Sequence, residues 1–161
     1  MNADMIQREQ LQALLHEGNA HMSFSEAVAQ FPGEYMNVMP PNVDYTPWQL
    51  LEHLRITQWD ILEFIRNPQH VSPEWPEGYW PAQDAKADDA AWQRTCAAFQ
   101  ADLAALEQIV TDPSIDLYTP LLHGTGQTVF REILVVADHN SYHIGEFAIL
   151  RQVMGTWRAH V

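Results

Sequence analysis

The segment 68–84 combines four prolines with three aromatic residues and lies between two stretches with helical spacing. The prolines are Pro68, Pro73, Pro76 and Pro81, and the aromatic residues are Trp75, Tyr79 and Trp80. A polar, flexible linker would not contain so many aromatic side chains. A long, stiff and apolar connection most simply crosses the length of a helical bundle and packs against it, which leaves the two helices that it joins parallel.

Helical spacing of apolar residues predicts four long helices. They cover about residues 4–17, 47–67, 88–111 and 128–155. The second has the clearest start, because Thr46, Pro47 and Gln49 supply an N-cap, a proline at the first helical position and a capping-box glutamine. No stretch predicts a strand. The expected fold class is therefore all-α, a four-helix bundle with long crossover connections, formed by residues 1–161 as a single domain.

Two shorter features complete the predicted helices. Gly18 and Asn19 are expected to cap the first helix at its C-terminus. A short helical turn is expected from Ser23 or Ser25 to Phe31, because Pro32 follows it.

The composition excludes several classes of function. Twenty-one acidic residues against eight basic ones give a formal net charge of −13, which repels nucleic acids and anionic membranes. The apolar run 133–137 is far shorter than the roughly 20 residues of a membrane span. The N-terminal residues show no secretory signal, and the single cysteine, Cys96, fits a reducing compartment. We expect a cytoplasmic protein in which Cys96 is a buried apolar residue rather than a nucleophile.

Histidines provide the first indication of chemistry. His139 and His143 lie four residues apart in the last predicted helix and so share one face. His53 lies at the edge of the apolar face of the second predicted helix, as the other two do on theirs. Three neutral imidazoles would bind one side of a divalent first-row metal ion and leave positions for water and substrate. The alternative is three unrelated histidines that are solvated or hydrogen-bonded.

Two segments resemble a known family. Residues 48–54 (WQLLEHL) and 138–146 (DHNSYHIGE) resemble the DinB-like, YfiT-like superfamily of four-helix-bundle metalloproteins, and the resemblance covers nearly the whole chain. It implies that His53, His139 and His143 bind a divalent metal ion such as Zn, Ni or Fe. The family pattern often has Gln after the glycine of the second segment, where this chain has Glu146.

Three functions remain open. A metal ion at these histidines would lower the pKa of a bound water or thiol, which permits either hydrolysis or transfer of a low-molecular-weight thiol to an electrophile. Relatives in the resembling family include both kinds of protein, and the thiol would have to be a cosubstrate. The alternative is a non-catalytic metal-binding or stress-response binding protein. The catalytic base is not identified, and the candidates are four acidic residues: Glu52, Asp60, Glu132 and Glu146.

Other polar residues carry weaker expectations. His123 precedes the last helix and reaches the site only if its loop folds back, so we predict that it is not a ligand. His21 is more simply a capping or surface residue than part of the site's mouth. Gly145 inside a helix indicates a close approach to the backbone by a neighbouring helix or by a substrate, and helix packing is the simpler cause. Asn140 and Arg151 lie on the apolar face of the last helix and need partners, such as Glu132, Asp60 or a second subunit.

Association is also expected. Six tryptophans and an apolar crossover exceed what a core of this size needs. We therefore predict a homodimer that acts on a small-molecule substrate and binds neither nucleic acid nor membrane.

Overall fold

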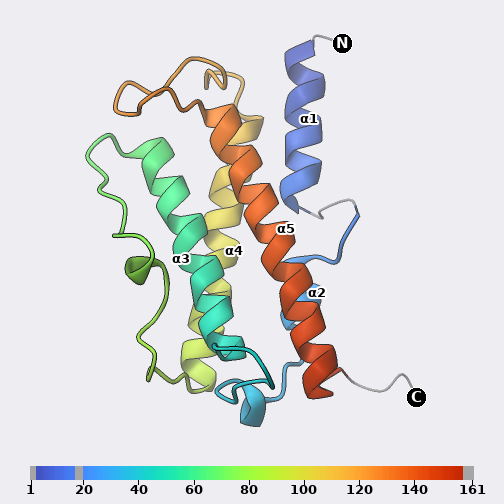
Figure 1. Cartoon of the computed structure of the whole chain (residues 1–161). Coiled ribbons are helices and arrows are strands. Elements are labelled where there is room, and N and C mark those ends of the chain that lie inside the picture. The colour runs from blue at the N-terminus through green and yellow to red at the C-terminus, as the bar shows by residue number, and fades with distance from the viewer. Residues whose placement is uncertain (1–2, 17–19, 158–161) are drawn as a thin grey trace.

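The computed structural model describes residues 3–16 and 20–157. It is all-α, with four main helices packed together (Figure 1) and no strand in the described part of the chain. The main helices are α1 (Ala3–His16), α3 (Pro47–Arg66), α4 (Asp89–Thr111) and α5 (Val129–Met154). The shorter elements are α2 (Phe24–Val28) and the 3-10 turns η1 (Gly33–Tyr35) and η2 (Glu77–Tyr79). The predicted fold class is confirmed.

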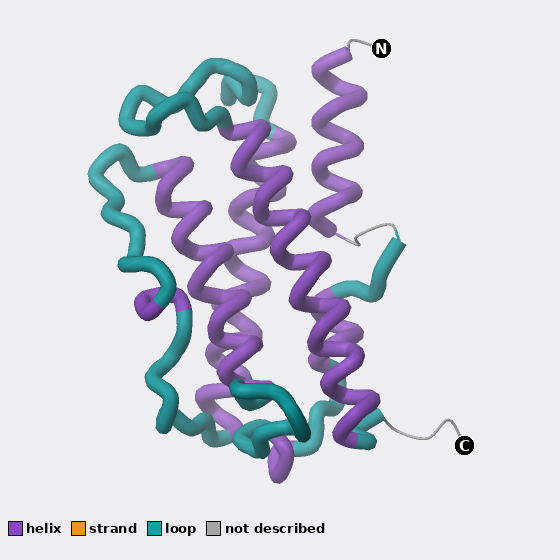
Figure 2. The backbone as a smooth tube through the Cα atoms, in the orientation of Figure 1, coloured by secondary structure: helices purple, strands orange, loops and turns teal. Residues whose placement is uncertain are grey.

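The direction of the helices follows from the crossover. α3 and α4 run the same way, and α1 and α5 run in the opposite direction (Figure 1). The chain between α3 and α4 returns along the outside of the bundle as an irregular segment interrupted only by η2 (Figure 2). The parallel arrangement predicted from the prolines and aromatic residues is confirmed. It leaves the crossover lying against α3, the helix that carries His53.

Capping residues set the helix ends as predicted. Thr46 accepts a hydrogen bond from the backbone of Gln49, whose side chain bonds back to the Thr46 N–H. The side chains of Asp88 and Thr128 cap α4 and α5, and each accepts one hydrogen bond from a backbone N–H of its helix. Gly155 ends α5 with a left-handed backbone, φ 65°. The cap expected at residues 18–19 lies outside the described residues.

The short helix α2 ends earlier than predicted. It begins after Ser23, which forms a capping box with Glu26, and stops at Val28 instead of Phe31. Gln30 has φ 52°, in the left-handed region, which no helix can continue through.

α1 is short and packs on α4 and α5, and α2 packs further along α5 (Figure 1). α1 covers the apolar cluster that contains Leu62, and α2 covers the apolar cluster that contains Phe99.

Two polar residues of α5 have partners that differ from those expected. The Asn140 amide donates to the side-chain oxygen of Gln58 on α3, over 2.9 Å. Arg151 is only 2% exposed and binds no carboxylate among the described residues; it donates to three backbone carbonyls instead. These belong to Ala27, Ala29 and Thr156. Glu132 and Asp60 are therefore not the partners, because α3 and the connections beside α5 supply oxygen atoms that the sequence pattern does not reveal. A contact with a second subunit stays a prediction.

Gly145 also differs from expectation. A Cβ atom built at this position meets nothing within 4 Å, so no neighbour within the described chain requires a glycine there. The predicted close packing at Gly145 is wrong for the single chain.

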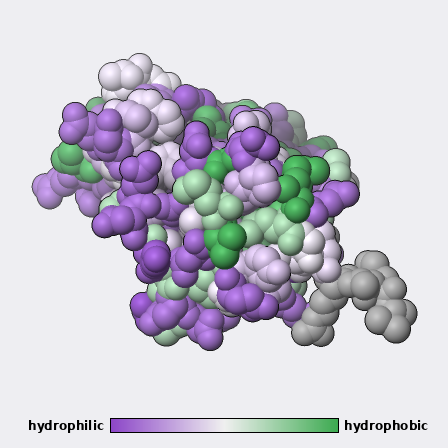
Figure 3. Space-filling model, turned by 60° about the horizontal axis from the view of Figure 1, so that its bottom comes forward, coloured by the Kyte–Doolittle hydropathy of each residue, from purple (hydrophilic) through white to green (hydrophobic). Residues whose placement is uncertain are grey.

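The surface combines hydrophilic and hydrophobic residues. On the face seen in Figure 3, hydrophobic residues gather in small groups near the middle, and hydrophilic residues lie toward the left and lower edges. Within the described ranges, no helix combines the length and the apolar character that crossing a bilayer requires. The crossover is less buried than predicted, because Trp75 is 72% exposed. Tyr79 and Trp80 of the same segment lie beside His53.

Candidate metal centre

His53 on α3 and His139 and His143 on α5 come together between the two helices. The His53 Nε2 atom lies 3.2 Å from the Nε2 atom of His139 and 3.2 Å from that of His143. Metal–nitrogen bonds of about 2.0–2.1 Å would place two such nitrogens about 2.9 Å apart at a right angle and about 3.4 Å apart at a tetrahedral angle. Both separations fit two nitrogens bound to one ion, and the ligand atoms of all three histidines lie within 4.8 Å of one another. In the part of the chain that the structure describes, this is the one group of three or more metal-ligating side chains.

The outer ring nitrogens determine where the lone pairs point. His53 Nδ1 lies 2.8 Å from the Tyr79 carbonyl oxygen, and His143 Nδ1 lies 2.6 Å from a Glu146 carboxylate oxygen. Both oxygens only accept, so each Nδ1 carries the proton and each Nε2 presents a lone pair in the neutral ring. Two lone pairs 3.2 Å apart cannot form a hydrogen bond with each other. A cation between them resolves this conflict, so the residues fit a metal ion.

Burial keeps the rings neutral. It lowers the pKa of His53, and with repulsion from His53 it lowers the pKa of His139 to about 4. Burial and the two neighbouring imidazoles lower the pKa of His143 to about 3. All three rings are unprotonated near neutral pH, which is the form that binds metal.

The crossover holds His53 in place. The Tyr79 carbonyl belongs to η2, and the Trp80 ring after it stacks on His53 with centroids 4.0 Å apart and planes 3° apart. The Tyr79 hydroxyl donates to Asp60, whose other oxygen lies 2.7 Å from His70 Nε2. Burial and the neighbouring Asp60 raise the pKa of Tyr79 to about 12. This segment therefore orients a candidate ligand, a role that the proline and aromatic pattern did not reveal.

A cavity of about 420 Å³ opens beside the three histidines. Its walls come from α3, from the crossover and from α5, and they are partly aromatic. Apolar lining residues are Ile61, Phe64, Trp75 and Val135, and polar ones include Thr57, Gln127, Arg131 and Glu132. Its volume is in the range that takes a small organic molecule. The arrangement offers three neutral nitrogens on one side of a space open to a substrate.

The four acidic candidates for a base are placed differently. Glu52 turns away from the cavity and binds Arg55 and Thr95. Asp60 lines the cavity, but both of its oxygens are hydrogen-bonded. Glu132 also lines it and pairs with Arg131 at 2.6 Å. Glu146 contacts the ligand candidate His143.

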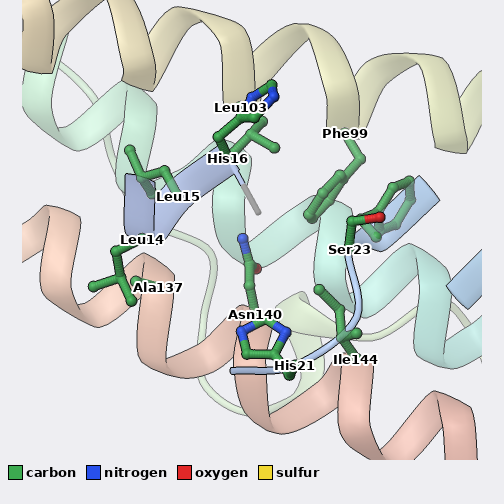
Figure 4. A pocket seen from close by; sticks show the side chains of 11 residues that line it. Leu14, Leu15, His16, His21, Ser23, Phe99, Leu103, Ala137, Asn140 and Ile144 are labelled. Atoms are coloured by element: carbon green, nitrogen blue, oxygen red, sulfur yellow. The ribbon is translucent and has the colours of Figure 1, made fainter. Parts of the chain in front are cut away.

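His21 and His123 lie apart from the cluster. His21 bonds to Ser141, which is two residues from both His139 and His143 and so lies on the opposite side of α5. With Asn140 it lines a separate pocket of about 20 Å³ (Figure 4). His123 Nε2 lies 2.6 Å from the Phe64 carbonyl oxygen, outside the cluster, as predicted.

Cys96 is buried among apolar residues, and burial raises the pKa of its thiol to about 11. Both features agree with a core role.

Comparison with known proteins identifies the family. The family model for the DinB superfamily matches residues 7–147, which is most of the chain. The chain therefore belongs to the DinB superfamily, as the resemblance predicted. Neither the curated proteins nor the solved structures include a match. Metal binding by the three histidines stays a prediction.

Proposed function

We propose that this DinB-superfamily chain is a metal-dependent enzyme acting on a small molecule held in the 420 Å³ cavity. The observation that carries the proposal is the convergence of three Nε2 atoms beside that cavity, with two lone pairs facing each other at 3.2 Å. A Zn, Ni or Fe(II) ion bound there would act as a Lewis acid and lower the pKa of a water molecule or of a low-molecular-weight thiol. The reaction is then either hydrolysis or transfer of that thiol to an electrophile.

The chain's own residues would position the substrate. Arg131 and Glu132 lie about two helical turns before His139 on α5, and Arg131 is about 12 Å away along the helix axis. A substrate whose reacting group lies at the histidines would therefore extend its far, polar end toward Arg131. The apolar walls between these two ends would hold its middle by excluding water. The proposal thus requires a molecule about 12 Å long with an apolar body.

Metal content tests the first step of the proposal. Elemental analysis of the purified wild-type protein should give about one divalent ion per chain, and His139→Ala should lose it. His16→Ala is the matched control, because His16 is exposed on α1 and lies outside the cluster. A wild-type protein that binds no Zn, Ni or Fe, even after dialysis against each ion, would refute the proposal.

Turnover tests the second step. Metal-loaded protein is assayed with esters and amides without thiol, and with electrophiles in the presence of several low-molecular-weight thiols. A hydrolase turns over the first set alone, whereas a thiol transferase needs the thiol. Metal binding without turnover in either set would support the alternative, a non-catalytic metal-binding protein.

A further inference from the structure

The three candidate ligands have different partners at their outer ring nitrogen. His143 Nδ1 faces the carboxylate of Glu146 at 2.6 Å, and His53 Nδ1 faces a neutral backbone carbonyl at 2.8 Å. His139 Nδ1 is buried and makes no hydrogen bond of standard geometry among the described residues, with the Asn140 side chain beside the ring. Of the three candidate ligands, only His143 therefore has a charged acceptor.

The carboxylate of Glu146 is held from two sides. Glu146 follows His143 by three residues on α5, so both side chains leave the same face of the helix. Its second oxygen accepts a hydrogen bond from the hydroxyl of Tyr45, which lies just before α3. Since both partners donate, both Glu146 oxygens act as acceptors, as in an ionised carboxylate.

From this arrangement we infer that Glu146, held by Tyr45, is a positioning residue that makes His143 the strongest metal donor of the three histidines. The inference deepens the proposed function and rests on the proposed metal site. A carboxylate that accepts the Nδ1–H fixes the ring orientation and raises the basicity of Nε2. A charged acceptor does this more strongly than a carbonyl, because charge-assisted hydrogen bonds are about twice as strong as neutral ones.

The test compares Glu146→Gln with the wild type. Glutamine keeps the size and an acceptor oxygen but removes the charge, so a purely spatial role would survive the change. Zinc affinity is measured by competition with a chromophoric chelator. We expect Glu146→Gln to weaken zinc binding about 10- to 100-fold. Tyr45→Phe leaves the carboxylate in place without its second partner, so it should cause a smaller loss.

Two controls separate this effect from general damage. Glu63→Gln removes a carboxylate that pairs with Arg66 on α3, outside the site, and should leave zinc affinity unchanged. In zinc-loaded protein, the proton NMR signal of the His143 Nδ1–H should move upfield in Glu146→Gln as the charged acceptor is lost. A structural role alone would not shift this one signal selectively.

The outcomes distinguish the inference from the proposed function. If the wild type binds no zinc, both are overturned. If the wild type binds zinc and Glu146→Gln binds it equally well with an unmoved Nδ1–H signal, only the inference is overturned. If Glu146→Gln does not fold, Tyr45→Phe decides, and an affinity equal to that of the wild type overturns the inference.

Discussion

Acidification should destabilise the metal-free protein through the histidine cluster. Burial lowers the pKa of His139 to about 4 and that of His143 to about 3, whereas both have a pKa of about 6.5 in the unfolded chain. Between pH 6.5 and 4 the unfolded state therefore binds more protons than the folded state. Stability falls as the pH drops through 6.5, and the decline from these groups ends near the folded pKa values.

The magnitude follows from the same values. At pH 5 a histidine with a pKa of 6.5 unfolded and about 4 folded loses about 2 kcal/mol of stability relative to neutral pH. Both rings border an open cavity, so solvent reduces this to about 1–2 kcal/mol for each ring. The two rings together should lower the free energy of unfolding by about 2–4 kcal/mol at pH 5.

Urea unfolding in the presence of a chelator, at several values between pH 7.5 and pH 5, measures this loss. His139→Gln replaces one titrating ring by a neutral amide, so the variant should lose about 1–2 kcal/mol less than the wild type over the same range. Gln93→Ala, which changes an exposed side chain of α4 that does not titrate, should keep the wild-type dependence. If His139→Gln and the wild type show the same pH dependence, the buried neutral cluster described above is refuted.

Four further predictions concern the metal, the core and the surface. A zinc concentration 100 times the Kd should stabilise the wild type by about 2.7 kcal/mol in thermal unfolding, and His139→Ala should abolish this gain. Arg151→Met should lower the free energy of unfolding by about 3 kcal/mol in urea, since three carbonyls lose a charged donor, and Arg151→Lys should cost less. Gly145→Ala should raise that free energy by up to about 1 kcal/mol, because its methyl group enters open space; a loss would reveal a neighbour from another chain. The homodimer stays a prediction. Light scattering at several concentrations should give the mass of two chains, and a mass of about one chain would contradict it.

The helices were predictable because their signals are local. A capping threonine, a proline at the first helical position and a glutamine three residues after the cap act within one turn, so the start of α3 could be read from the sequence alone. The end of α2 depends instead on the left-handed backbone of Gln30, which a sequence pattern does not specify. Local chemistry therefore predicted the boundaries of the long helices, and the short connections were less predictable.

The site was predictable only in part. His139 and His143 share a face because of their spacing, and the place of His53 at the edge of an apolar helix face added it, in agreement with the family resemblance. The partners that orient these rings come from elsewhere: a backbone carbonyl from η2, a stacked Trp80 and a hydroxyl from Tyr45. A carbonyl has no signature in the sequence, since every residue carries one. Such contacts become visible only when the path of the connections is known.

The crossover illustrates how one sequence feature can serve two purposes. Its prolines and aromatic residues predicted a stiff segment along the bundle, and that path is what brings the Tyr79 carbonyl and the Trp80 ring against His53. The same segment contributes Trp75 and Tyr79 to the cavity wall. A flexible linker of equal length could join α3 to α4 but would not hold a carbonyl within 2.8 Å of an imidazole nitrogen without a large loss of entropy. The stiffness of this connection therefore contributes to the site as well as to the topology of the bundle.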